Sequence, residues 1–256
     1  ERITRVRGDL LSKGFLRETL EKYKPEVIIH LASLPIANVS NDYPEEATND
    51  IFLNSVTLLD VIKSLSYKIN RIVYISSSMV YGDFVSSESG EILPAREDQA
   101  CHPKCIYGSM KLSGEILTRT YNKRFKIPFV IVRPSAVYGP TDCNRRVTEI
   151  FAMDSLLGKE LILDNGGTHQ LDFTYVKDLA KGIELAAKSE KALGETFNIT
   201  RGEGRTIKEL AEILIKLNPE RGAKAIVKAV DVYRPNRGTL DISKSKTILG
   251  YNPEYS

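Results

Sequence analysis

Short runs of β-branched and aliphatic residues alternate with longer segments whose apolar residues recur at helical spacing, from about residue 3 to residue 199. This alternation is typical of parallel βαβ units. Two of the runs, VIIHL and IVYIS, are almost continuously hydrophobic, as expected of strands that helices cover on both faces. The sequence therefore predicts an α/β fold built on a doubly wound parallel sheet.

The same pattern places the individual elements. The expected strands are 3–7, 27–31, 71–75, 129–133 and 196–199, and the expected helices are 13–22, 45–66, 106–124, 147–157, 176–188 and 207–217, the last capped by Thr206. Residues 1–140 are expected to hold most of the sheet, and residues 141–256 mainly a smaller lobe, with 170–200 returning to the sheet. No repeat or long linker separates these parts, so we expect one continuous unit.

Composition excludes several classes of protein. The 256 residues, 42% hydrophobic and 27% charged, suffice for a sizeable core. A net charge of +3 with scattered lysines and arginines gives no basic stripe for nucleic acid. No apolar run approaches the ~20 residues that span a bilayer. Three cysteines, an odd and sparse set, favour a reducing compartment, so we expect a cytoplasmic protein without membrane or nucleic-acid partners.

A tyrosine and a lysine share one face of the helix expected at 106–124. Tyr107 and Lys111 stand at positions i and i+4 in CIYGSMKLSGEIL, so their side chains lie over one another. A phenol is a poor base at neutral pH, and a neighbouring ammonium group favours its ionised form. Such a pair exchanges a proton with a substrate hydroxyl while a cofactor carries hydride. The spacing alone is common by chance, and an ordinary helix surface is the alternative.

A serine-rich loop follows the strand expected at 71–75. Ser76, Ser77 and Ser78 come directly after RIVYI, and Gly82 marks a turn. Hydroxyls there lie beyond the carboxyl end of a central strand, where open α/β sheets bind ligands. A serine loop more often satisfies its own backbone. The loop followed by a Tyr/Lys pair on the next helix is a much stronger signal than either feature alone.

The segment Cys101-His-Pro-Lys-Cys105 offers two thiols and an imidazole within five positions. A metal site with such spacing normally includes a second pair of ligands, and the sequence shows none. We therefore expect no metal. His30 lies in a hydrophobic strand and His169 in a turn, and neither is assigned a role.

These motifs resemble the extended short-chain dehydrogenase/reductase family, and within it the NAD-dependent epimerase/dehydratase group. The matching segments, in order, are RGDL, PEVIIHLAS, NSVTLL, ISSSMVYG, YGSMK, RPSAVYGP, LDFTYVKDLAKGI, GETFNIT and SKSKTILGYNP. Their order along nearly the whole chain is far more specific than any one of them. The resemblance implies a Rossmann-like cofactor-binding domain at 1–140, NAD as the cofactor, and a substrate-binding lobe.

The resemblance also implies roles for individual residues. Ser77, Tyr107 and Lys111 are the implied catalytic residues: the tyrosine acts as the base, the lysine bonds the cofactor ribose, and the serine bonds the reacting oxygen. The implied cofactor-binding residues are Asp9, Leu10, Leu31, Ala32, Ser33, Asn54, Ser76, Tyr107, Lys111 and Pro134. The implied substrate-binding residues are Ser77, Ser78, Arg145, Arg146 and Arg234.

The chain departs from the family pattern at several points. No Gly-rich phosphate loop lies between a strand and a helix, although the family opens with one. We therefore expect the native protein to carry a further N-terminal segment that includes it. Ala136 and Leu171 stand where many members have Asn and Arg. Arg145 and Arg146 supply replacement charge in the substrate loop, or form a solvated surface pair.

The resemblance favours epimerisation of a nucleotide-diphosphate sugar through a transient keto-sugar. A 4,6-dehydratase is disfavoured, because such members carry Thr-Asp-Glu where this chain has Ser77, Ser78 and Met79. A NAD(P)-dependent dehydrogenase or reductase of a sugar nucleotide or small alcohol is the alternative, and a non-catalytic cofactor-binding protein is a third interpretation. The family pairs the helices at 45–66 and 106–124 across a twofold axis, so we expect a homodimer.

Overall fold

A four-stranded parallel sheet organises the protein. A computed structural model describes residues 3–33, 35, 37–228 and 235–255. The strands β1 (Val27–His30), β2 (Arg71–Ile75), β3 (Phe129–Arg133) and β8 (Thr196–Asn198) lie side by side in the order β1-β2-β3-β8. All pairs are parallel. Every residue of β2 and β3 is buried, which explains why the sequence of these strands is almost continuously hydrophobic.

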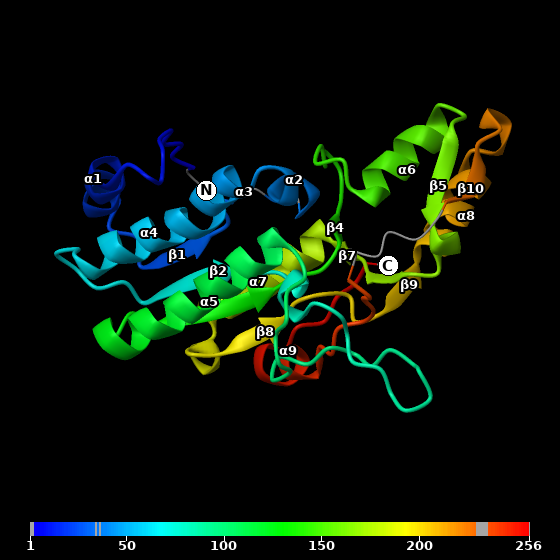
Figure 1. Ribbon diagram of the computed structural model, residues 1–256. Helices are drawn as coiled ribbons and strands as arrows, with labels where there is room; N and C mark the ends of the chain where they lie inside the picture. Colours follow the sequence, from blue (N-terminus) through cyan, green and yellow to red (C-terminus); the bar gives the residue numbers. More distant parts are fainter. Residues whose placement is uncertain (1–2, 34, 36, 229–234, 256) are drawn as a thin grey trace.

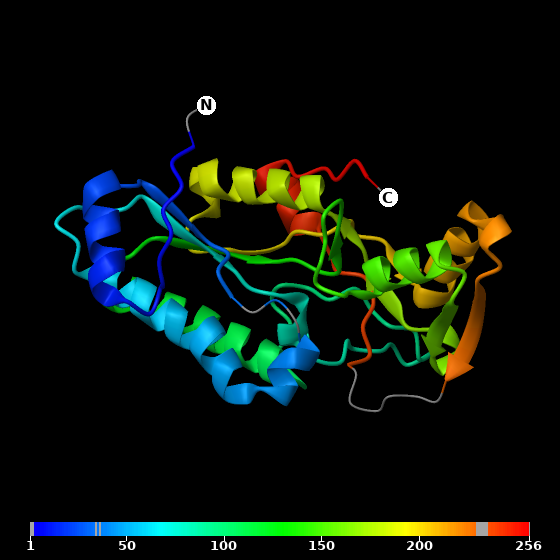
Figure 2. The ribbon, with the colours of Figure 1, turned by 90° about the horizontal axis from the view of Figure 1, so that it is seen from above.

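Helices cover both faces of this sheet (Figure 2). One layer contains α1 (Lys13–Tyr23), α4 (Asn54–Lys63) and α5 (Ile106–Phe125), and the other contains α7 (Val176–Lys188) and α9 (Ser243–Leu249). Successive strand residues point to opposite layers. Ile72 and Tyr74 pack among residues of α1 and α4, whereas Val73 and Ile75 pack among residues of α7 and α9. The doubly wound α/β fold is therefore confirmed.

Two of the expected elements are wrong. Residues 3–7 form no strand and are exposed. A β-branched run becomes a strand only when a neighbouring strand takes up its backbone hydrogen bonds, and none of the described residues pairs with this run. The single helix expected at 45–66 is divided into α3 (Pro44–Ala47), a turn of π-helix (Thr48–Leu53) and α4. Hydrophobic periodicity does not reveal such a π-helical turn, which is frequent at functional sites.

A second lobe lies at one end of the sheet (Figure 1). Parallel strands β5 (Glu160–Asp164) and β10 (Lys224–Lys228) pack with α6 (Val147–Leu156) and α8 (Ile207–Leu217) around a small hydrophobic cluster. Thr206 and Glu209 form a reciprocal capping box at the start of α8, as expected for Thr206. The division of the chain at residue 140 stays a prediction.

Short elements complete the fold and join the lobe to the sheet. They are α2 (Ala37–Asp42), β4 (Val137–Tyr138), β6 (Gln170–Asp172), β7 (Thr174–Tyr175), β9 (Gly204–Thr206) and the 3-10 helices Ser78–Tyr81, Asn165–Gly167, Glu190–Ala192 and Pro219–Arg221. β4 pairs with β7 and β6 with β9. The side chain of Asp172 is fully buried and accepts hydrogen bonds from Thr200, Gly202 and Leu240. One carboxylate thus ties three distant segments together.

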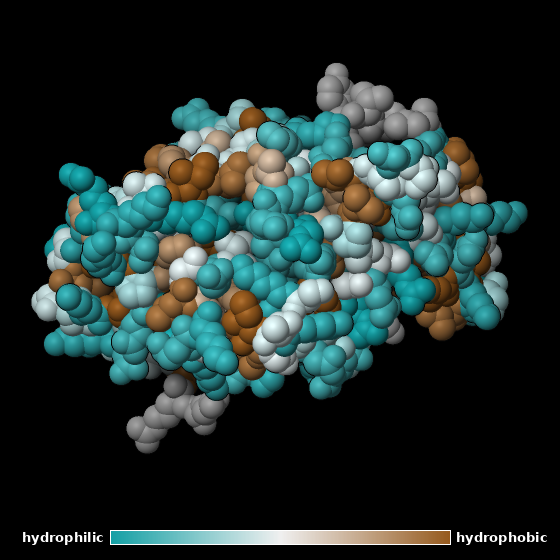
Figure 3. Space-filling model, turned by 90° about the horizontal axis from the view of Figure 1, so that it is seen from below, coloured by the Kyte–Doolittle hydropathy of each residue, from teal (hydrophilic) through white to brown (hydrophobic). Residues whose placement is uncertain are grey.

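The surface carries no extended apolar field on the face seen in Figure 3, where hydrophobic residues form separate spots among hydrophilic ones. Isolated exposed apolar residues are normal on soluble domains. Within the described ranges, no helix has both the length and the apolar character that crossing a membrane requires.

Candidate active site

The serine loop begins where β2 ends. Ser76, Ser77 and Ser78 are 1%, 8% and 1% exposed. The Ser77 hydroxyl caps the short helix Ser78–Tyr81 by accepting from the Met79 amide at 3.2 Å, and the Ser78 amide donates to the Pro134 carbonyl at 2.9 Å. The loop is therefore fixed between the carboxyl ends of β2 and β3, as the sequence pattern predicted.

The first turn of α5 packs against this loop. Cys105 caps the helix, because its Sγ accepts from the Gly108 amide at 3.4 Å. Gly108 approaches the Met79 carbonyl so closely that a Cβ there would lie 2.6 Å from the oxygen. Only glycine permits this approach. It brings Tyr107 close to Ser77, so two of the implied catalytic residues, from different segments, lie together.

The Tyr107 hydroxyl lies in a desolvated position. Burial raises its pKa above the usual value for a phenol, while the hydrogen bond from Ser77 and the positive charges of Arg146 and Arg237 lower it. Burial dominates, so Tyr107 is a neutral phenol at neutral pH. The sequence analysis expected Lys111 to lower this pKa, and in the protein alone the other three groups do so instead.

Lys111 lies beside Tyr107 and is almost completely buried, at 4% exposure. Its Nζ donates to the Ile75 carbonyl at 2.8 Å and to the Ser33 hydroxyl at 3.0 Å, and stands 5.8 Å from the centre of the Tyr107 ring. Burial lowers the pKa of Lys111 to about 8, so the amine remains a cation at pH 7. Ser33 and the Tyr107/Lys111 pair, predicted from two separate motifs, thus meet at the carboxyl edge of the sheet.

Several predicted cofactor residues line the same edge. Leu31 and Ala32 are exposed beyond β1. Asn54 donates through Nδ2 to the Asp50 carbonyl at 3.0 Å, whereas its buried Oδ1 has no partner. Such an unsatisfied acceptor suits a ribose hydroxyl. Together with the donors of Lys111, it makes this edge a good fit to the nicotinamide-side ribose of a dinucleotide.

Three other predicted cofactor residues have contacts of their own. Asp9 accepts from the Leu11 amide at 2.9 Å just before α1, and Leu10 is half-buried beside it. The Ser76 hydroxyl donates to the buried carboxylate of Glu115, so it points into the protein interior. The roles of Asp9, Leu10 and Ser76 toward a cofactor stay predictions.

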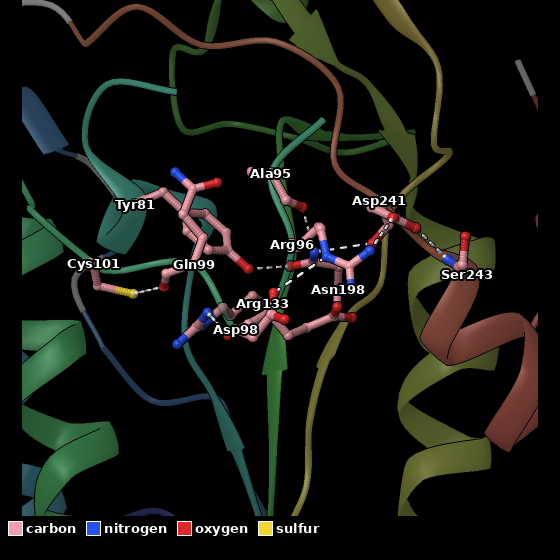
Figure 4. A network of polar contacts seen from close by, with 11 residues as sticks. Tyr81, Ala95, Arg96, Asp98, Gln99, Cys101, Arg133, Asn198, Asp241 and Ser243 are labelled. Atoms are coloured by element: carbon pink, nitrogen blue, oxygen red, sulfur yellow. Dashed lines mark hydrogen bonds and ion pairs between the residues drawn. The ribbon is translucent and has the colours of Figure 1, made fainter. Parts of the chain in front are cut away.

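A polar network extends from the end of the serine loop, and Figure 4 shows its members Tyr81, Arg133, Asn198 and Asp241. Arg133 makes two hydrogen bonds to the carboxylate of Glu115, at 2.9 and 2.7 Å, and a third to the Glu97 carbonyl at 3.2 Å. The Tyr81 hydroxyl, at the end of the serine loop, donates to Asn198 at 2.7 Å. Asn198 in turn donates to the backbone carbonyls of Ala95 and Asp241. The network joins β3 and β8 to the serine loop and the C-terminal segment.

Three arginines were expected around the substrate, and the structure shows a fourth. Arg146 donates to the Val137 carbonyl at 3.0 Å and acts electrostatically on Tyr107. Arg145 is exposed, and Arg234 lies outside the described residues. The sequence analysis missed Arg237, whose Nη2 donates to the hydroxyls of Ser78 at 3.1 Å and Ser135 at 2.8 Å. It contacts Ser78 across 159 positions, a separation that no local pattern reveals.

The cysteine and histidine residues have structural contacts. The Cys101 thiol donates to the Gln99 carbonyl at 3.8 Å, and Cys105 caps α5. All three cysteines are free thiols, and the described residues contain no cluster suited to a metal ion. His30 shares a hydrogen bond of 3.0 Å with Ser55, and burial lowers the pKa of this imidazole to about 4, with the charge of Lys111 adding to the effect.

Comparison with known proteins identifies the family. Residues 1–200 match the NAD dependent epimerase/dehydratase family. The chain belongs to this family. A relative named as an uncharacterized UDP-glucose epimerase of Bacillus subtilis is 31% identical over 261 residues, covering 100% of this chain and 77% of that protein. The human dTDP-D-glucose 4,6-dehydratase is 25% identical over 254 residues, covering 97% of this chain and 70% of that protein.

Among solved structures, UDP-glucuronic acid 4-epimerase from Bacillus cereus, in complex with UDP-glucuronic acid and NAD, superimposes with a TM-score of 0.88 at 30% identity. The match covers 98% of this member of the NAD-dependent epimerase/dehydratase family and 76% of that chain. The expected family, the Rossmann-like fold and NAD as the cofactor are confirmed.

Proposed function

We propose that this protein catalyses NAD-dependent epimerisation of a nucleotide-diphosphate sugar through a transient keto-sugar. The observation that carries the proposal is the convergence of Ser77, Tyr107 and Lys111 at the carboxyl edge of the sheet. The Ser77 side chain lies close enough to the Tyr107 hydroxyl to lower its pKa, and the Lys111 ammonium lies 5.8 Å from the centre of the tyrosine ring. A hydroxyl pair beside a buried cation is suited to reversible proton transfer at a secondary alcohol.

Each residue has a separate task in this proposal. Tyr107 accepts the proton of the reacting sugar hydroxyl as that carbon is oxidised and returns it when the keto-sugar is reduced from the other face. Ser77 holds the reacting oxygen, because its hydroxyl already lies against that of Tyr107. NAD, when bound, would supply a reversible hydride acceptor, so no external oxidant would be consumed. Arg146 and Arg237 favour the ionised phenol, which opposes the effect of burial on the pKa of Tyr107.

The cofactor would be held by residues from several elements. Lys111 and the unpartnered Oδ1 of Asn54 supply a donor and an acceptor for ribose hydroxyls. Leu31, Ala32 and Ser33 form the loop after β1, where the dinucleotide of a doubly wound fold lies. Pro134 contributes backbone at the end of β3. For the substrate, we assign Arg145, Arg146 and Arg234 to the diphosphate, although Arg234 lies outside the described residues.

Epimerisation is preferred to dehydration because elimination requires an additional acid and base near the reacting centre. Positions 78 and 79, directly after Ser77, carry a serine and a methionine. Neither side chain supplies a carboxyl group. A net dehydrogenase is distinguished by stoichiometry, because it would convert added NAD into NADH in proportion to product.

The proposal is tested with Tyr107→Phe, using proton NMR to resolve sugar-nucleotide products. Loss of the proton-transfer group is expected to lower kcat by roughly 10²- to 10⁴-fold while sugar-nucleotide binding persists. Tyr23→Phe, an exposed tyrosine at the end of α1, is the matched control and is expected to behave as the parent. Full activity of Tyr107→Phe, or stoichiometric NADH formation by the parent, would contradict an epimerase with this mechanism.

We also propose that the protein is a homodimer in the cytoplasm. The helical segments 45–66 and 106–124 expose the apolar side chains of Leu53 and Ile116, at 39% and 58%, which pairing across a twofold axis would bury. The three free thiols suit a reducing compartment. Light scattering at micromolar concentration is expected to give twice the chain mass, and a monomer mass would exclude the dimer.

A further inference from the structure

Arg237 places a half-buried cation next to the catalytic residues. Its guanidinium donates to two hydroxyls, those of Ser78 and Ser135. Ser78 directly follows Ser77, and Ser135 directly follows Pro134 at the end of β3. The guanidinium therefore stands at the reacting end of the site, where Tyr107 also responds to its charge.

The charge of Arg237 lacks a partner in the described part of the chain. No carboxylate of these residues lies within ion-pairing distance, and its Nε is buried without any hydrogen-bond acceptor. Among the charges that act on Arg237, that of Asp172 compensates it most, but this carboxylate is already engaged by Thr200, Gly202 and Leu240. Burial lowers the pKa of Arg237 to about 10, so the side chain is still a cation at pH 7.

A half-buried cation that contacts only neutral hydroxyls is unfavourable, because the cost of partly removing it from water is not offset. An anionic ligand offsets this cost and also uses the free Nε. Guanidinium and carboxylate groups match geometrically and form the stronger, charge-assisted class of hydrogen bond. Arg237 is therefore suited to an anion that arrives with the substrate.

We propose that Arg237 is a specificity-determining residue that binds a carboxylate on the sugar ring. The substrate is then a nucleotide-diphosphate hexuronic acid rather than a neutral hexose. This inference rests on the proposed function, which supplies the nucleotide sugar. The diphosphate is a less suitable partner, because Arg237 bonds the serines that flank the reacting centre, whereas Arg145 and Arg146, which are assigned to the diphosphate, belong to another segment.

The test compares UDP-glucuronic acid with UDP-glucose, which differ only in whether C6 is a carboxylate. Equilibrium binding to the protein with NAD is measured by calorimetry, and turnover by proton NMR. The parent is expected to bind and convert UDP-glucuronic acid more efficiently by about 10- to 100-fold, the range for one hydrogen-bonded charge pair. Arg237→Gln is expected to remove most of this preference, and Arg237→Lys to retain part of it.

Arg205→Gln is the matched control, because this arginine on β9 is exposed. It is expected to keep the parent preference. Circular dichroism checks that the variants are folded, and the comparison of the two sugars in the parent needs no variant. Equal affinity of the parent for both sugars would overturn the role of Arg237 but not the proposed function. So would an Arg237→Gln variant that weakens both sugars equally, which would assign this residue to the diphosphate. Binding of neither sugar would overturn the proposed function as well.

Discussion

The buried pair of Glu115 and Arg133 allows a quantitative prediction about stability. Their side chains are 2% and 4% exposed and share two hydrogen bonds. Glu115→Gln keeps the shape but removes the negative charge, so Arg133 remains as a buried cation without its counter-charge. Breaking a buried pair in this way typically costs about 3–5 kcal/mol. We therefore expect the free energy of unfolding to fall by about 3 kcal/mol or more.

Urea unfolding followed by circular dichroism measures this loss. With an m-value of about 3 kcal/mol/M, a decrease of 3 kcal/mol moves the midpoint down by about 1 M. Glu184→Gln is the control, because the ion pairs that Glu184 forms with Lys181 and Lys188 are exposed, and we expect it to cost less than about 1 kcal/mol. The double variant Glu115→Leu/Arg133→Met is expected to be more stable than Glu115→Gln, since no charge is left buried.

The result that would refute this reasoning is a Glu115→Gln midpoint within about 0.2 M of the parent. It would mean that the two side chains are solvated, or that water replaces the lost charge. The stability lost in the double variant is also compared with the losses in Glu115→Leu and Arg133→Met alone. A loss in the double variant that equals or exceeds the sum of these two losses would show that the pair does not act as a unit.

Two further predictions concern other buried or strained positions. The pKa of His30 is about 4 in the folded protein against about 6.5 unfolded. The unfolded state therefore binds the extra proton, and about 3 kcal/mol of stability is lost as the pH falls from 6.5 to 4. His30→Gln is expected to flatten this part of the profile of urea midpoints against pH, and an unchanged slope would exclude His30 as its source. Ala136 adopts φ 34°, so Ala136→Gly should stabilise the fold by about 0.5–1 kcal/mol, whereas Ala180→Gly in the exposed face of α7 should cost about 1 kcal/mol. Destabilisation by both glycines in thermal melting would show that Ala136 carries no strain.

The sequence predicted the central sheet well because its signal is local. The runs at 71–75 and 129–133 are buried on both faces, and such strands need no alternation to be recognised. Residues 3–7 have equally good strand character, yet they form no strand, because pairing depends on a neighbour and not on composition. The π-helical turn at Thr48–Leu53 was not predicted, because it preserves a helical pattern of apolar residues.

In the candidate site too, the residues with a local sequence signal were predicted and the others were not. Tyr107 and Lys111 are recognisable because one turn of helix separates them, and the serine loop because it directly follows a strand. Arg237 and the pair of Glu115 with Arg133 cannot be recognised from the sequence as parts of the site. Their contacts cross from one segment to another, and an isolated arginine or glutamate in the sequence looks like any surface charge.

The position of Arg237 along the chain has a consequence for biosynthesis. All four strands of the central sheet precede it in sequence, and domains begin to form while the ribosome is still translating. The hydrophobic interior can thus assemble around Ser77 and Tyr107 before the guanidinium that reaches Ser78 and Ser135 has been synthesised. A nascent polypeptide halted between β8 and residue 237 would have all four strands of the central sheet, but it would lack α9 and would be unable to select its ligand by charge.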